Sequence, residues 1–120
     1  EDAQYGIIGT ARLRFMKMRQ FKSAVLDNFP MLNKSSAVAY FTRFAVDQRF
    51  RGHGVGSLLL STCEEIAREE SLIAITLHTA ISNETVSQFY FNRGYRVDSI
   101  DLSRGYPCGF FIKMLKKNPN

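Results

Sequence analysis

A glycine-rich run at residues 51–57, Arg-Gly-His-Gly-Val-Gly-Ser, constrains the fold of this chain more than any other feature. Residues 37–46 before it are mostly apolar and rich in strand formers, which predicts a strand covered on both faces. After the run, apolar and charged residues take opposite sides at helical spacing, which predicts an amphipathic helix beginning near Gly56. The apolar side would comprise Leu59, Cys63, Ile66 and Ala67, and the charged side Glu64, Glu65, Arg68 and Glu69.

The alternation of strands and helices continues after this helix. Residues 72–78 form an apolar run of strand length. Ser82 or Asn83 can cap a second helix, and Gly94 can end it because glycine accepts the left-handed conformation at a helix C-terminus. Residues 95–100 and 109–115 flank a turn that contains glycine and proline, so they predict a closing antiparallel pair.

The first third of the chain gives a clear strand and a weaker helix signal. Residues 5–15 alternate apolar and basic side chains, which predicts a strand with one buried face. Residues 16–36 carry three apolar residues at helical spacing, which predicts a short helix that Pro30 stops. The inward positions would be Ala11, Leu13 and Phe15 in the strand, and Phe21, Val25 and Phe29 in the helix. We expect one α/β domain over residues 1–120.

Composition excludes several classes of protein. No apolar run approaches the roughly 20 residues that span a bilayer, and the first residues lack a signal-peptide pattern, so we expect a cytoplasmic protein without a membrane partner. Cys63 and Cys108 stand far apart without a Cys-x-x-Cys pair or a histidine cluster, so we expect reduced thiols and no metal site.

The formal charge of +5 would suit a polyanionic partner, but the basic residues are spread along the chain. The nearest approach to a basic patch is Arg12, Arg14, Lys17, Arg19 and Lys22. A nucleic-acid partner is therefore the weaker explanation, because a phosphorylated cofactor needs only a few cations.

The glycine-rich run predicts an anion site. A helix N-terminus presents unpaired N–H groups and about half a positive charge, and glycines let the backbone approach a phosphate closely. The dinucleotide fingerprint fails here because Ser57 or Leu59 stands where its third glycine is needed. The Walker phosphate loop fails because the run contains no lysine.

Two motifs in sequence order resemble those of the GNAT superfamily of N-acetyltransferases. The first motif, Gln/Arg-x-x-Gly-x-Gly/Ala, is filled by Arg51, Gly54 and Gly56. The second, Asn-x-x-Ala-x-x-Leu-Tyr-x-x-x-Gly-Phe, resembles residues 83–95, with Val86 and Tyr95 as conservative departures. Either motif alone could reflect a tight turn or a core aromatic residue, but both together, on the expected elements, favour the family.

The resemblance implies a mixed, mostly antiparallel sheet flanked by helices, and acetyl-coenzyme A or another acyl-coenzyme A as co-substrate without a metal. The strand before the glycines would splay from its neighbour and bind the pantetheine arm through its main chain. The pyrophosphate would lie on the glycine-rich run. The implied cofactor-binding residues are Phe44, Ala45, Val46, Arg51, Gly52, His53, Gly54, Val55, Gly56, Ser57 and Asn83.

The resemblance also implies that Tyr90 protonates the departing thiolate, with Phe89 packed inward beside it. A phenol with a pKa near 10 is protonated at neutral pH, so Tyr90 needs no unusual tuning. The general base stays open among His78, Glu84, Tyr40 and a water chain. Cys63 belongs to the apolar side of its helix, so direct attack by the amine is favoured over an acyl-enzyme.

The acceptor is less constrained than the cofactor. The resemblance implies a small-molecule amine or a peptide amine, and Tyr40, Arg43 and His78 are candidates for binding it. The family's usual opening, a strand, one or two helices and a second strand, has no counterpart in residues 1–120. We therefore expect either an N-terminally incomplete domain or a layer supplied by a partner chain, such as a homodimer.

Two alternatives stay open. Arg12 and Arg43 match arginines of the acyl-homoserine-lactone and N-acyl amino acid synthases, GNAT relatives that use longer acyl donors, but Tyr40 stands where those enzymes carry glutamate. If Phe21, Val25 and Phe29 of segment 16–36 lined an apolar acyl pocket, longer donors would fit. A non-catalytic module that binds coenzyme A would need the glycine-rich run but not Tyr90.

Overall fold

The computed structural model describes residues 9–116 as a twisted five-stranded sheet with both α-helices on one face. The strands are β1 (Gly9–Lys17), β2 (Ala37–Val46), β3 (Ala74–Ala80), β4 (Arg96–Asp101) and β5 (Cys108–Met114). The helices are α1 (Val55–Glu69) and α2 (Glu84–Phe91), and single 3-10 turns lie at Met18–Gln20 and Gln48–Phe50. No helix within these residues is long and apolar enough to cross a membrane.

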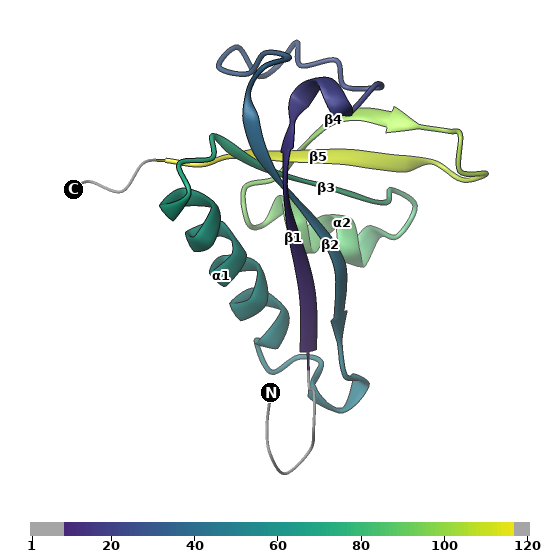
Figure 1. Ribbon diagram of the computed structural model, residues 1–120. Helices are drawn as coiled ribbons and strands as arrows, with labels where there is room; N and C mark the ends of the chain where they lie inside the picture. The colour runs from purple at the N-terminus through teal and green to yellow at the C-terminus, as the bar shows by residue number, and fades with distance from the viewer. Residues whose placement is uncertain (1–8, 117–120) are drawn as a thin grey trace.

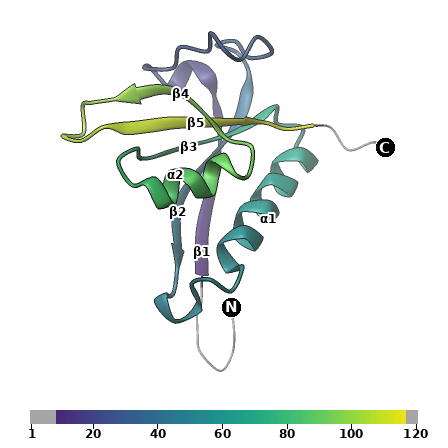
Figure 2. The same cartoon turned by 180° about the vertical axis from the view of Figure 1, so that it is seen from behind.

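The sheet order is β1-β2-β3-β5-β4, and every neighbouring pair is antiparallel except β2 and β3. The predicted mixed, mostly antiparallel sheet is therefore confirmed. In Figure 1, β1 and β2 cross β3 and β5 at a steep angle, which reflects the strong twist of the sheet. Figure 2, from behind, shows α1 and α2 side by side on their shared face.

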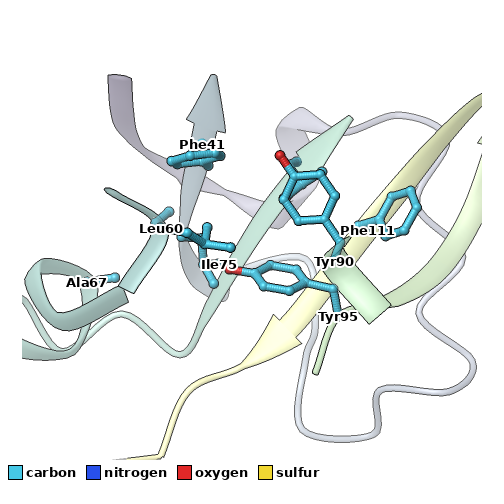
Figure 3. Close-up of a cluster of buried hydrophobic side chains, with 9 residues drawn as sticks. Phe41, Leu60, Ala67, Ile75, Tyr90, Tyr95 and Phe111 are labelled. Atoms are coloured by element: carbon cyan, nitrogen blue, oxygen red, sulfur yellow. The ribbon is translucent and has the colours of Figure 1, made fainter. Parts of the chain in front are cut away.

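The main core lies between the helices and the sheet. It brings together Leu60 and Ala67 of α1, Tyr90 of α2, and inward residues of β2, β3 and β5 (Figure 3). On β1 the expected inward residues Ala11 and Leu13 pack against this core, but Phe15 is 55% exposed. Helix α1 covers the start of β1, because a Cβ added at Gly9 would meet Leu59 and Val55 at 2.9 Å. Phe15 lies six residues further along the strand.

The prediction of a helix within residues 16–36 is wrong. Apart from one 3-10 turn, residues 18–36, here called the connecting segment, form turns. Phe21 and Phe29 enter a second core on the opposite face of the sheet, whereas Val25 is 54% exposed. The Asp98 carboxylate accepts hydrogen bonds from the amides of Val25 and Leu26 at 2.8 and 2.7 Å, and these bonds replace those of a helix.

The prediction of which side of α1 is buried is partly wrong. Leu60, Glu64 and Ala67 are its buried residues, whereas Ile66, expected inside, is 42% exposed. Glu64 was expected on the charged side, but it is buried because two side chains from other elements donate hydrogen bonds to it. The helix still buries one face, which is rotated from the expected one.

Candidate functional site

A groove opens where the two parallel strands separate. Strands β2 and β3 pair over three residue pairs, from Val38 with Ala74 to Tyr40 with Thr76, and no ladder pairs join them beyond these. Strand β2 continues alongside β1 as far as Val46. The groove has a volume of about 1130 Å³ and is lined by the ends of β2 and β3, the glycine-rich run and α2. A splayed strand next to the glycines was the prediction from the family resemblance.

The glycine-rich run forms a shallow cradle at the N-terminus of α1. Gly52 and Gly54 have φ angles of +84° and +81°, and a Cβ added to either would meet nothing within 4 Å. Gly54 is the N-cap, and the first turn of α1 carries no acidic residue that would repel an anion. Arg51 is exposed and lines the groove beside these glycines. Open space, free helix N–H groups and a cation together fit a phosphate group.

Gly56 has a different role from the other two glycines. A Cβ at Gly56 would approach the Phe44 ring at 3.0 Å and the Phe89 ring at 3.6 Å. The absence of a side chain therefore lets the first turn of α1 pack closely against β2 and α2. This contact holds the cradle next to the groove. Val55 and Ser57 of the same turn also line the groove, whereas His53 does not and its ring lies edge-on to Phe50.

Arg93 is a second cation beside the cradle, and the sequence analysis missed it. Its Nη1 donates a 2.8 Å hydrogen bond to the carbonyl oxygen of Phe89, and its Nη2 donates to the Ser57 hydroxyl. The guanidinium carbon lies 3.8 Å from the centre of the Phe89 ring, a cation–π geometry. Its place directly before Gly94 of the second motif was the signal that could have found it.

A β-bulge shapes the wall of the groove formed by β2. Arg43 and Phe44 together oppose the single residue Ala11 of β1, and Arg43 has a φ of +55°. A bulge leaves one residue outside the ladder and turns its main-chain groups away from the partner strand. Phe44, Ala45 and Val46, the predicted main-chain ligands of the cofactor, all line the groove, as does Arg43. Phe44 belongs to the bulge, and Ala45 and Val46 follow it.

Tyr90 lies on α2 at the groove, with its ring buried in the main core. Burial raises the pKa of Tyr90 to about 12. Figure 3 shows the Tyr90 and Tyr95 rings side by side with their hydroxyls pointing in different directions. Phe89, the neighbour of Tyr90, packs against the main core as expected. It is only half-buried, however, and it also lines the groove, where the Arg93 guanidinium covers its ring.

Tyr40 and His78 form a hydrogen-bonded pair across β2 and β3. The Tyr40 hydroxyl lies 2.7 Å from Nδ1 of His78, and the His78 ring also packs 4.7 Å from that of Phe110. Burial, and then the positive charge of Arg104, lower the pKa of His78. His78 lines the groove, whereas Tyr40, also predicted to bind the acceptor, is not among the lining residues. The pair therefore presents a neutral imidazole to the groove at physiological pH.

The remaining candidates separate into structural and exposed residues. Asn83 lines the groove, but its side chain caps α2 by accepting from the Val86 amide at 3.2 Å. Glu84 is exposed in the first turn of α2 and does not line the groove. Burial raises the pKa of the half-buried Cys63, which disfavours a thiolate nucleophile. Among residues 9–116 no group of three or more His, Cys, Asp or Glu side chains could hold a metal ion.

Residues 2–95 match the profile of the acetyltransferase (GNAT) family. The chain is 30% identical over 93 residues to N-alpha-acetyltransferase 60 of Danio rerio, an alignment that covers 75% of this chain and 37% of the relative. Among solved structures, Chaetomium thermophilum Naa20 in complex with a bisubstrate analogue superposes with a TM-score of 0.75 at 23% identity, over 98% of this chain and 64% of that one.

A third relative is Arabidopsis thaliana Naa50 in complex with the bisubstrate analogue CoA-Ac-MVNAL. Its TM-score is 0.67 at 20% identity, over 88% of this chain and 64% of that one. The chain thus spans 37% of the length of the curated relative and somewhat less than two thirds of each of these two structures. The two structural likenesses establish a shared fold.

Proposed function

Because the chain belongs to the GNAT acetyltransferase family, we propose that it transfers the acetyl group of acetyl-coenzyme A to a primary amine. The observation that carries this proposal is that the cradle, the bulged end of β2, Tyr90 and His78 all line one groove. The groove thus combines a binding site for an anionic cofactor with one group that can donate a proton and one that can accept a proton.

The cradle and its two arginines would hold the phosphates of coenzyme A. Arg51 stands at one side and Arg93 at the other, next to Ser57. The main chain of β2 after the bulge would bind the elongated arm, because it has no partner strand on the β3 side. The bound co-substrate supplies an acetyl thioester. The N–H groups released from the ladder by the bulge can stabilise negative charge on its carbonyl oxygen.

The two titratable groups at the groove suit the two proton transfers of the reaction. Tyr90 is protonated at neutral pH because its pKa is about 12, so it can donate a proton to the departing thiolate. His78 is neutral because its pKa is lowered, so it can take a proton from the acceptor's ammonium group before the attack, or from the amine nitrogen as it attacks. In the tautomer whose Nδ1–H donates to the Tyr40 oxygen, Nε2 carries no hydrogen and is the atom that accepts the proton.

The relatives support the N-terminal amine of a peptide as the acceptor. The structure of Arabidopsis thaliana Naa50 is a complex with the bisubstrate analogue CoA-Ac-MVNAL, and the Danio rerio relative is N-alpha-acetyltransferase 60. We therefore place peptide N-termini ahead of small-molecule amines as substrates.

Longer acyl donors receive less support than acetyl. Phe21 and Phe29, which would have lined an acyl pocket, lie in the second core and not along the groove. A non-catalytic coenzyme A module would have no need for the Tyr40–His78 pair, whose 2.7 Å hydrogen bond brings two polar side chains together beside the groove. Both observations favour acetyl transfer by an active enzyme.

Thermal unfolding with acetyl-coenzyme A, followed by coenzyme A release in the presence of a peptide, tests the proposal. A ligand at about 100 times its dissociation constant should stabilise the protein by roughly 2.7 kcal/mol. Octanoyl-coenzyme A in the same assay decides the acyl length, and acetyl should give the faster release. Stabilisation without any release would favour the binding module, and no stabilisation would remove the cofactor assignment.

A further inference from the structure

Aromatic rings enclose the Tyr40–His78 pair on the face of the sheet that carries the second core. The centre of the Phe21 ring, from the connecting segment, lies 5.1 Å from that of Tyr40 and 6.3 Å from that of His78. The Phe110 ring of β5 lies 4.8 Å from Phe21 and 4.7 Å from His78. Phe21 is only 7% exposed, so it excludes water from the part of the pair that it covers.

The other side of the imidazole is open to the groove. His78 lines the groove, whereas Phe21 does not. Burial is the first cause that lowers the pKa of His78. The titratable groups that act on this imidazole, within the described residues, are Tyr40, Arg104 and Asp101. Burial therefore acts on the imidazole more strongly than either charge does.

The connecting segment is anchored to β4 shortly after Phe21. The Asp98 carboxylate accepts hydrogen bonds from the amides of Val25 and Leu26 at 2.8 and 2.7 Å. Leu26 has a φ of +65°, a left-handed conformation that is unfavourable for a residue other than glycine. Strained backbone persists only where the surrounding contacts fix it. In Figures 1 and 2 the segment lies beside β4, where these contacts are made.

We propose that Phe21 is a positioning residue, which holds the Tyr40–His78 pair in its hydrogen-bonded geometry and shields it from water, and that Asp98 acts through Phe21 by anchoring the connecting segment. The inference rests on the proposed function, because the geometry of the pair matters for turnover only if His78 takes the proton of the amine.

A base that accepts a proton at one nitrogen must keep one tautomer and one ring orientation, and the hydrogen bond at its other nitrogen sets both. Water behind the ring would compete for the Tyr40 hydroxyl and would stabilise the charged imidazolium. A packed ring at Phe21 prevents both effects, because it locks the rotamers of the side chains that it touches.

Phe21→Leu and Phe29→Leu form a matched pair of variants. Both residues belong to the connecting segment and are buried in the second core, with exposed fractions of 7% and 4%. Among the described residues, Phe29 contacts the Arg96 guanidinium at 5.7 Å and makes no ring contact with Tyr40 or His78. Both variants should lose similar stability in denaturant unfolding. Only Phe21→Leu should raise the pKa of His78 toward the ordinary 6.5, measured from the imidazole NMR signals.

The two variants should also differ in turnover. In Phe21→Leu, kcat with a peptide acceptor should fall by about tenfold, a part of the roughly 10²–10⁴-fold that a positioned base contributes. The acidic limb of kcat/KM should move to higher pH together with the NMR titration. The dissociation constant of acetyl-coenzyme A should stay unchanged, because Phe21 does not line the groove. Phe29→Leu should keep the wild-type kcat and the wild-type limb.

Asp98→Asn tests the anchor without any change in the aromatic core, and it replaces Phe21→Leu if that variant fails to fold. A side-chain amide has one oxygen acceptor and one nitrogen donor, so it cannot accept from two backbone amides as the carboxylate does. The pKa of His78 should rise in Asp98→Asn as in Phe21→Leu. Asp27→Asn, the same change at an exposed residue of the connecting segment, is the control and should leave this pKa unchanged.

The NMR titration separates the inference from the proposed function, because it needs no turnover. The chain has two histidines, so His78→Gln assigns the signals. An unchanged titration of His78 in Phe21→Leu, or an equal change in Phe29→Leu, would overturn the inference and leave the proposed function intact. A wild-type titration in Asp98→Asn would remove Asp98 from it. A limb of kcat/KM that does not follow the titration in Phe21→Leu would instead overturn the role of His78 as the base.

Discussion

The Tyr95 hydroxyl donates a 2.8 Å hydrogen bond to Oε2 of Glu64, and both side chains are buried between α1 and the sheet. The other carboxylate oxygen, Oε1, accepts from Nζ of Lys113 on β5 at 3.1 Å. Burial, and then the charge of Glu64, raise the pKa of Tyr95, so the phenol remains a donor across the physiological range. This network joins the middle of α1 to the last residue of the second motif and to β5.

Replacing Glu64 should therefore destabilise the fold. Glu64→Ala leaves the Tyr95 hydroxyl buried without its acceptor and removes the partner of Lys113. We expect the free energy of unfolding to fall by about 2 kcal/mol, the range for hydrogen bonds to charged groups. Denaturant unfolding measures the change. Glu65→Ala, one residue on and 49% exposed, is the control and should change stability by less than about 0.5 kcal/mol.

The cradle can be tested with two glycines of the same conformation. Gly54 and Gly105 have φ angles of +81° and +82°, and an added Cβ would meet nothing within 4 Å at either. Gly54→Val and Gly105→Val should therefore suffer similar backbone strain, of order 1–3 kcal/mol. Only Gly54→Val should weaken coenzyme A binding, because its side chain would occupy the groove. Equal affinities of the two folded variants, measured by calorimetry, would contradict the assignment of the cradle.

Tyr90→Phe should separate chemistry from binding. The ring keeps its place against Tyr95 and Phe111, so folding and coenzyme A affinity should change little. Turnover should fall by about 10²–10⁴-fold if the phenol protonates the thiolate. The measurement compares kcat with a peptide acceptor and the dissociation constant of coenzyme A. If kcat with rate-limiting chemistry were unchanged, Tyr90 would have a packing role alone.

His78 should set the acidic limb of the pH profile. Its base form is neutral, and burial lowers its pKa below the ordinary 6.5, so kcat/KM should rise with pH along a limb whose midpoint lies below pH 6.5. His78→Gln should lose most activity and this limb together. A limb that persists in His78→Gln would assign it to another group, such as the acceptor amine.

The lowered pKa of His78 also makes the stability of the fold depend on pH. The folded state binds the His78 proton less tightly than the unfolded state does, so the stabilisation is present above pH 6.5. It should disappear as the pH falls through the lower folded-state pKa. Unfolding curves of wild type and His78→Gln should therefore converge in this acidic interval, and a constant difference between them would contradict the lowered pKa.

Local signals in the sequence predicted much of the site. The N-cap at Asn83 is confirmed by its hydrogen bond to the Val86 amide, and Gly94 has the expected left-handed conformation, with a φ of +92°. Gly54 likewise adopts a positive φ at the start of α1. Each of these features depends on residues within one helical turn, so a short window of sequence contains the information.

Features that depend on distant partners were missed. The spacing of Phe21, Val25 and Phe29 suggested a helix, but the backbone of this segment is bound by Asp98, more than 70 residues away. Because Glu64 is charged, the sequence pattern placed it on the solvent side of its helix. In the structure it is buried, because Tyr95 and Lys113 donate hydrogen bonds to its carboxylate. Tyr40 and His78 come together only through the strand order, which no local periodicity predicts.

The bulge at Arg43 and Phe44 divides β2 into two parts of opposite parity. Before it, odd-numbered residues such as Phe41 face the helices; after it, the even-numbered Phe44 does, and its ring lies 5.2 Å from that of Phe41. The two halves of one strand can therefore be altered separately. Under the proposed function, substitutions near Tyr40 should alter the choice of acceptor, while the half from Phe44 to Val46 keeps its contacts with the donor. The acceptor side and the donor side of the groove can thus be engineered separately on one strand.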